Sequence, residues 1–335
     1  MSGVDLNSLP LSDLAPNTRI GEALALSRPA MARPLRFIPE DGALVEVVTR
    51  TLQSRLLLTP KPLLNRIIIG ALARASRRYG VQVVVMAFLS NHYHLVAWIE
   101  DARQLARFMT FFNSKLAREI GRLTGWKQKV WSRRYQAIVI SPEEEAQVGR
   151  LSYVLSHGVK EGLVARVEDW PGVHAASALL SGLPLEGVWY DRTKEYLSKL
   201  KGKKTDPARF AEPETLTLAP LPCWKHLSPE AYRARIATLI QQIEEDAAAQ
   251  RQANGRLPLG ADTIQRQDPR TEPNRTKKSP APRFHAVRKW VRLELYQTYT
   301  LFVQAYREAA ELLRLGNRNA PFPRGCFPPP LPFVG

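Results

Sequence analysis

The stretch VQVVVMAFLSNHYHLVAWI, residues 81–99, decides the fold. Val81–Leu89 is so dense in valine that it predicts a strand buried on both faces. Ser90-Asn91 predicts a turn, and His92–Ile99 is predicted to return as the antiparallel partner strand. The two segments therefore indicate an antiparallel sheet.

Elements on both sides of this hairpin extend it into an α+β domain. Periodic apolar residues, with Pro or Gly at their ends, predict a strand at Leu44–Thr51, a helix at Leu63–Tyr79, a helix at Asp101–Leu123, a strand at Val130–Ile140, and a helix capped by Ser141 that runs to about Lys160. The order is strand, helix, strand, strand, helix, strand, helix. This order predicts an α+β fold of the ferredoxin-like kind, with one antiparallel sheet and helices on one face.

The charge of the chain indicates a polyanionic partner. Its 335 residues include 48 Lys+Arg against 31 Asp+Glu, a formal net charge of +17. Hydrophobic residues make up 44% and charged residues 24%, the balance of a globular protein. Nucleic acid is the first candidate partner and an anionic membrane surface the second, and charge alone does not choose between them.

Several classes of protein are disfavoured. Two cysteines are too few for a disulfide scaffold or a multi-cysteine zinc site. The first residues lack the basic start and apolar core of a secretory signal. The longest apolar stretches, Ile67–Ala73 and Val83–Leu89, are shorter than the about 20 residues that span a bilayer. We therefore expect a soluble protein of a bacterial-type cytoplasm.

Composition divides the chain into three predicted regions. Residues 1–30 are polar and punctuated by proline, which predicts an extended lead-in. Residues 31–182 form the α+β domain. Residues 183–335 form a basic, helical and Pro-rich extension, with a linker at 201–222 and a last helix over His285–Leu315.

A His-x-His pair lies in the hairpin. Successive side chains of a strand point to opposite faces, so His92 and His94 share one face and Tyr93 is expected in the core behind the other. Two imidazoles on one face can hold a divalent ion, although two partly buried, hydrogen-bonded histidines are the simpler interpretation of the pair by itself.

A tyrosine and a third histidine follow on the predicted helix after Ser141. Tyr153 and His157 are four residues apart, so they lie on the same side of that helix. Brought against the histidine pair, they would place a nucleophile beside a metal that polarises a phosphate oxygen. Tyr153 as a core aromatic is the plainer alternative. The remaining histidines, His174, His226 and His285, have no comparable context and are interpreted as incidental.

Four ordered motifs resemble those of one enzyme family. LSNHYHLV (residues 89–96) is similar to the His-hydrophobic-His motif of the HUH single-tyrosine transposases. SYVLSHGVKEGLV (residues 152–164) resembles their nucleophile helix, Tyr-Ile-x-x-Asn-Pro-Val-x-x-Gly-Leu-Val. MARPLRF (31–37) and WSRRY (131–135) resemble further family elements, and Asp169-Trp170-Pro171 follows the helix as a similar element does there. The REP-associated tyrosine transposases are the branch that the motifs resemble most.

The resemblance implies a set of roles. His92 and His94 would be metal ligands, Tyr153 the nucleophile, and His157 would occupy the place of an Asn or Gln ligand. The chain departs from the family at His157-Gly158, where the family has Asn-Pro, and at Ser90, where it has Pro. The implied cofactor is Mg²⁺ or Mn²⁺, and three nitrogen ligands favour the softer Mn²⁺.

The implied function is a DNA transposase. Tyr153 would attack single-stranded DNA, in a hairpin with a short guide sequence beside it, to leave a 5′-phosphotyrosine and a free 3′-OH. The protein would act as a monomer or homodimer, without a membrane partner and in association with the nucleoid. We place phosphate contacts on two groups of basic residues, one near the site and one in the extension: Lys115, Arg118, Arg122, Arg133, Arg134, Lys277, Lys278, Arg288, Lys289 and Arg292.

Three alternatives stay open. The basic residues near the site are also typical of a solvated helix face, and those of 265–293 are typical of a disordered arm. The fold can persist as a DNA- or RNA-binding protein whose chemistry is lost through the changes around His157. An RNA-binding sheet is a third reading, although it would favour aromatics over histidines on the exposed face. The extension is expected to add DNA affinity.

Overall fold

The computed structural model describes residues 34–202, 206–273 and 282–330. Two compact units are distinguished, Met1–Leu35 and Arg36–Gly335, and nearly all described residues belong to the second. The predicted lead-in over residues 1–30 and the first part of the MARPLRF motif lie outside the described residues.

Strands of the described residues form two sheets. The main sheet has the order β2-β3-β1-β4-β7, and the second pairs β5 with β6. The bounds of the strands are β1 Ala43–Arg50, β2 Gln82–Phe88, β3 His92–Ile99, β4 Gln136–Ile140, β5 Leu185–Tyr190, β6 Ala211–Leu216 and β7 Phe284–His285.

Helices connect and cover these strands. Their bounds are α2 Pro62–Tyr79, α3 Ala102–Thr124, α4 Glu144–Leu155, α5 Ala176–Ser181, α6 Arg192–Leu200, α7 Pro229–Asn254, α8 Ala261–Arg266 and α9 Lys289–Arg314, with short 3₁₀ turns at Leu52–Ser54, Val167–Asp169, Pro207–Phe210 and Pro222–Trp224. The predicted order from the first strand to α4 and the α+β class are confirmed. No helix of the described residues is long and apolar enough to cross a membrane.

The main sheet is antiparallel except at one edge. β1 lies between β3 and β4 and is antiparallel to both, and β2 is antiparallel to β3. β7 pairs with β4 in parallel, so a strand from the far end of the chain closes this edge. The β1–β3 register sets Val48 opposite His94 and Arg50 opposite His92.

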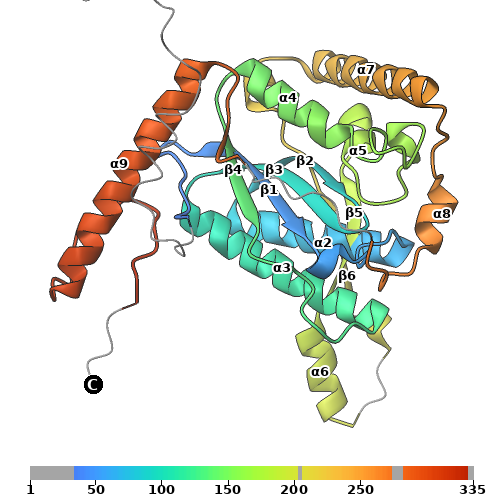
Figure 1. Ribbon diagram of the computed structural model, residues 1–335. Helices are drawn as coiled ribbons and strands as arrows, with labels where there is room; N and C mark the ends of the chain where they lie inside the picture. Colours follow the sequence, from blue (N-terminus) through green and yellow to red (C-terminus); the bar gives the residue numbers. More distant parts are fainter. Residues whose placement is uncertain (1–33, 203–205, 274–281, 331–335) are drawn as a thin grey trace, which may run out of the picture. The chain divides into compact units, whose positions relative to one another are not determined.

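The two faces of β3 have different neighbours. Tyr93 is fully buried and stacks on Phe88 at 4.7 Å, and its ring lies 5.8 Å from that of Phe112 on α3. Its predicted place in the core is therefore confirmed. The opposite face carries His92 and His94 and is covered by α4, as Figure 1 shows for the side of the sheet away from α3.

The prediction of helices on one face is therefore wrong. It holds for α3 and for α2, which packs against α3, but α4 lies on the other side of the sheet. The reason is the apolar side of α4, whose buried residues Leu151, Val154 and Leu155 pack towards β2 and β3.

Two predicted boundaries also shift. β4 is limited to Gln136–Ile140, since Trp131 makes only an isolated bridge with Thr51. Helix α4 begins after Glu143 rather than Ser141 and ends at Leu155, not near Lys160. The chain turns at Gly158, which has φ 94°, so His157 lies in the turn that follows the helix. Proline cannot adopt this φ, and the departure at Gly158 therefore has a structural counterpart.

Residues after 182 pack on the domain that precedes them, for example on helix α2. Strand β5 approaches α2 so closely that a Cβ on Gly70 would lie 2.2 Å from the Val188 carbonyl oxygen. Helix α7 begins after Ser228, whose hydroxyl accepts from the Ala231 N–H. The last helix begins at Lys289 instead of His285, because His285 belongs to β7.

Candidate active site

Three histidines converge on the α4 side of the sheet. Their ligand atoms, one each from His92, His94 and His157, all lie within 4.8 Å of one another. The ring centroids of His94 and His157 are 4.3 Å apart, and those of His92 and His94 are 5.3 Å apart. Strand alternation places the first two, and the turn at the end of α4 brings the third towards them.

The Nδ1 atom of each ring faces an oxygen acceptor. His92 Nδ1 lies 2.6 Å from Asn91 Oδ1, and His94 Nδ1 lies 2.7 Å from Glu46 Oε1. His157 Nδ1 lies 2.7 Å from the Tyr153 carbonyl oxygen. Since a carbonyl or carboxylate oxygen needs a donor, each Nδ1 carries the proton and each Nε2 keeps its lone pair. Such outer partners fix the tautomer and orientation of metal-binding histidines.

The surroundings keep two of these rings neutral. Burial, together with the charges of His94 and Lys160, lowers the pKa of His157 to about 2. Burial also lowers the pKa of His92 well below its usual value, with further contributions from His94 and Arg50. A neutral imidazole is the form that binds a metal, so the donor set fits a divalent ion.

Tyr153 lies against the histidines and remains accessible. Its ring centroid is 5.5 Å from that of His94 and 4.7 Å from that of His157, and the residue is 37% exposed. Arg150 Cζ lies 3.9 Å and Lys160 Nζ 3.5 Å from the ring centroid. Burial raises the pKa of Tyr153 while the Arg150 charge opposes this, so the phenol is protonated in the protein alone.

Glu46 is a site residue that sequence reasoning missed. It is 1% exposed, and its carboxylate accepts from His94 Nδ1 at 2.7 Å and from Arg150 Nη2 at 2.8 Å through the same oxygen. Burial alone would raise the pKa of Glu46, but these bonds and one from His285 outweigh it and lower the pKa. A lone acid within the apolar strand LVEVVTRT was the available signal.

His285 is the second missed residue, and its interpretation as incidental is wrong. Its Nε2 lies 2.7 Å from Glu46 Oε2, the carboxylate oxygen that does not contact His94. His174 is buried elsewhere, with its Nδ1 accepting from the Ala176 N–H, and His226 is exposed. Nothing in the local sequence around His285 points to the site.

The predicted basic residues fall into different environments. Arg133 lies close enough to Arg50, opposite His92, for its charge to help burial lower the pKa of Arg50. Seven of the predicted DNA contacts are exposed, four on α3 and the loop after it and three at the start of α9: Arg118, Arg122, Arg133, Arg134, Arg288, Lys289 and Arg292. Lys277 and Lys278 lie outside the described residues.

Lys115 is not available to DNA, which corrects its predicted role. It is 8% exposed, its Nζ donates to the Tyr190 carbonyl oxygen at 2.5 Å, and it lies 3.9 Å from the centroid of the Trp189 ring. Strand β5 therefore covers a position that helical periodicity alone placed on the surface.

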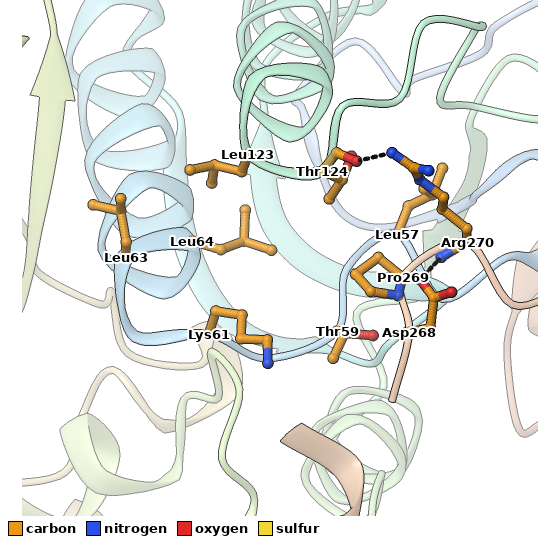
Figure 2. A pocket seen from close by; sticks show the side chains of 10 residues that line it. All are labelled: Leu57, Thr59, Lys61, Leu63, Leu64, Leu123, Thr124, Asp268, Pro269 and Arg270. Atoms are coloured by element: carbon orange, nitrogen blue, oxygen red, sulfur yellow. Dashed lines mark hydrogen bonds between the residues drawn. The ribbon is translucent and has the colours of Figure 1, made fainter. Parts of the chain in front are cut away.

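A separate cavity lies away from the histidines, where residues after α8 cross the start of α2 and the end of α3 (Figure 2). Its volume is about 410 Å³, and four of its ten lining residues are leucines: Leu57, Leu63, Leu64 and Leu123. The cations at its rim are engaged with backbone oxygens, Arg270 with Thr124 at 2.9 Å and Lys61 with Gln265 at 2.5 Å. These bonds hold the crossing segment in place.

Solved structures that are similar to this chain include two transposases. One is a REP-associated tyrosine transposase bound to a REP hairpin, at 17% identity and a TM-score of 0.36, covering 45% of this chain and 86% of that one. The other is a proposed transposase from Deinococcus radiodurans, at 13% identity and a TM-score of 0.27, covering 36% of this chain and 95% of that one. No family model and no curated protein matches the chain. The function proposed next therefore rests on the motifs and on the site itself.

Proposed function

We propose that the protein is a metal-dependent endonuclease and strand transferase of the single-tyrosine transposase type, acting on single-stranded DNA. One observation carries this proposal: three imidazoles, whose Nδ1 atoms have oxygen partners, converge beside an accessible tyrosine that two cations flank. The antiparallel order β2-β3-β1-β4 supports a ferredoxin-like domain over residues 31–182, with 183–335 as its extension.

His92, His94 and His157 would hold the metal. When bound, a divalent ion would polarise a phosphate oxygen and neutralise charge that develops on the phosphate. An all-nitrogen donor set favours Mn²⁺ over Mg²⁺. The outer bonds to Asn91 and Glu46 keep the rings oriented without it.

Tyr153 would be the nucleophile of a transesterification. Its Oη forms a bond to phosphorus as the bond from phosphorus to the 3′ oxygen breaks, which leaves a 5′-phosphotyrosine and a 3′-OH. The phenolic proton passes to solvent and the departing oxygen takes one up. Attack by another 3′-OH reverses these bonds and rejoins the strand. Arg150 and Lys160, whose cationic groups lie over the ring, would stabilise the phenolate and attract the phosphate.

DNA is the proposed polyanion because the cations gather around this chemistry. Arg50 lies opposite His92, Arg133 is close to Arg50, and the start of α9 adds a second exposed basic group. These positions would contact phosphates in a salt-dependent manner. Hairpin DNA, the form named for the first similar structure, is the substrate to test.

A DNA-binding protein without cleavage is the second candidate. The raised pKa of Tyr153 favours it, because burial works against the phenolate. It predicts hairpin binding that weakens steeply with salt, and no cut strand with any divalent ion.

The test is formation of a covalent adduct between the protein and an end-labelled DNA hairpin in the presence of Mn²⁺. We expect an adduct that survives denaturation, and its loss in Tyr153→Phe. Tyr196→Phe is the matched control, because Tyr196 is 61% exposed on α6. An adduct that persists in Tyr153→Phe would exclude this nucleophile, and binding without cleavage in the wild type would favour the second candidate.

A further inference from the structure

Residues 284–288, in the C-terminal part of the chain, reach the candidate active site. His285 pairs with the edge of β4, and its carbonyl oxygen accepts from the Ser141 N–H at 2.9 Å. The backbone N–H groups of Val287 and Arg288 donate to the two carboxylate oxygens of Glu143, each at 2.9 Å. Since Glu143 directly precedes α4, the segment also holds the helix that bears Tyr153.

The side chain of His285 enters the network behind the metal ligands. Glu46 Oε1 accepts from His94 Nδ1 and from Arg150, and Glu46 Oε2 faces His285 Nε2 at 2.7 Å. The carboxylate is 1% exposed, so solvent does not replace a lost donor there. Each of its oxygens is thereby held by a protein donor, which fixes the plane of the carboxylate.

We propose that His285 is a positioning residue for the metal centre and acts through Glu46 on His94. This proposal rests on the proposed function. The His285 N–H holds one oxygen of Glu46, and the other oxygen then faces the His94 N–H and keeps that ring in its Nε2-ligating tautomer. Without His285, a buried charged oxygen loses its donor, and the carboxylate turns towards Arg150 and away from His94.

Several contacts fix β7 in place and so hold His285 against Glu46. Phe284, beside His285, is 5% exposed and lies in an aromatic cluster, with ring centroids 6.2 Å from Phe37 and 5.0 Å from Tyr296. The backbone pairing with β4, the burial of Phe284 and the bonds to Glu143 restrict this segment. They leave the His285 side chain little freedom to move away from Glu46. The extension therefore contributes to the metal site and does more than add DNA affinity.

The experiment measures Mn²⁺ affinity of the full chain by calorimetric titration, without DNA. We expect His285→Leu to weaken Mn²⁺ binding about 10-fold or more, the usual effect of removing an outer partner of a ligand. His285→Gln places an amide N–H where Nε2 was, and we expect it to restore most of the affinity. His226→Leu, at an exposed histidine, is the control and should bind as the wild type does.

The outcomes separate this proposal from the function on which it rests. Wild-type affinity in His285→Leu, with a wild type that binds Mn²⁺, would overturn the role of His285 and leave the transposase proposal intact. A wild type that binds no Mn²⁺ would overturn both. If His285→Leu does not fold, His285→Gln is compared with His285→Asn, whose shorter amide does not reach Glu46. Equal affinity in that pair would also overturn the proposal.

Discussion

Two buried carboxylates, Glu46 and Glu119, differ in what surrounds them. Glu46 is 1% and Glu119 0% exposed, and both have a lowered pKa despite burial. Glu119 on α3 accepts two bonds from the Arg192 guanidinium, at 3.0 and 2.5 Å, and pairs with Arg122 at 3.0 Å. Glu46 is bonded by two imidazoles and by Arg150.

The two carboxylates differ in whether their partners keep an atom that can bind another group. A guanidinium that pairs with a carboxylate completes a charge pair, so the Glu119 cluster joins α3 to α6 and serves stability. An imidazole that donates through one nitrogen still has a lone pair on the other. Glu46 therefore orients the His94 ring, whose second nitrogen is a proposed metal ligand, whereas the cations around Glu119 have no such second atom to offer.

The largest effect on stability is expected from Glu119→Gln. Breaking a buried pair takes from Arg192 one of its two carboxylate partners, the other being Glu195. We expect the free energy of unfolding to fall by about 3 kcal/mol. Urea unfolding checks this value. Mn²⁺ titration of the folded variant checks that Glu119 has no role in metal binding. A Mn²⁺ affinity that falls together with stability would remove the distinction between the two carboxylates.

Glu46→Gln should give the opposite pattern. The amide cannot accept at every position where the carboxylate does, so we expect Mn²⁺ affinity to fall up to about 100-fold. The loss of unfolding free energy should be smaller than in Glu119→Gln. Of the three groups bonded to Glu46, Arg150 carries a permanent charge, whereas Glu119 faces three cations, Arg192, Lys115 and Arg122. Calorimetric titration and urea unfolding of the same samples decide this. Unchanged Mn²⁺ affinity would mean that Glu46 does not orient His94.

Much of the site could be predicted because strand and helix periods are local. Alternation in residues 92–94 placed two histidines on one face, and spacing on one helix placed Tyr153 and His157 together. Helix α4 ends earlier than its pattern predicts, yet the turn at Gly158 still brings His157 to the other two rings.

The rest depends on contacts between distant segments. His285 lies 239 positions from Glu46, and no local period connects a two-residue parallel strand to the edge of the sheet. The same reason explains the error at Lys115. Its helical spacing resembles a solvated basic face, and only the packing of β5, through the Tyr190 carbonyl, puts it inside.

Acid should affect the Glu119 cluster in a defined direction. Because Arg192 and Lys115 help to lower the pKa of Glu119 in the folded protein from 4.5, the carboxylate stabilises the fold at pH values above 4.5. This contribution is lost as the pH falls below 4.5 through the lowered folded value, since the unfolded chain then binds the proton first. Glu119→Gln has no such proton to bind.

The difference in unfolding free energy between the wild type and Glu119→Gln should therefore be largest near neutral pH and shrink towards pH 3. Urea unfolding of both proteins across this range measures it, with Glu46→Gln as a parallel series because the pKa of Glu46 is also lowered. If the difference stays constant with pH, the shape of the Glu119 side chain and not its charge holds α3 to α6. Glu119 would then not be the stabilising charge pair with which the orienting carboxylate Glu46 is contrasted.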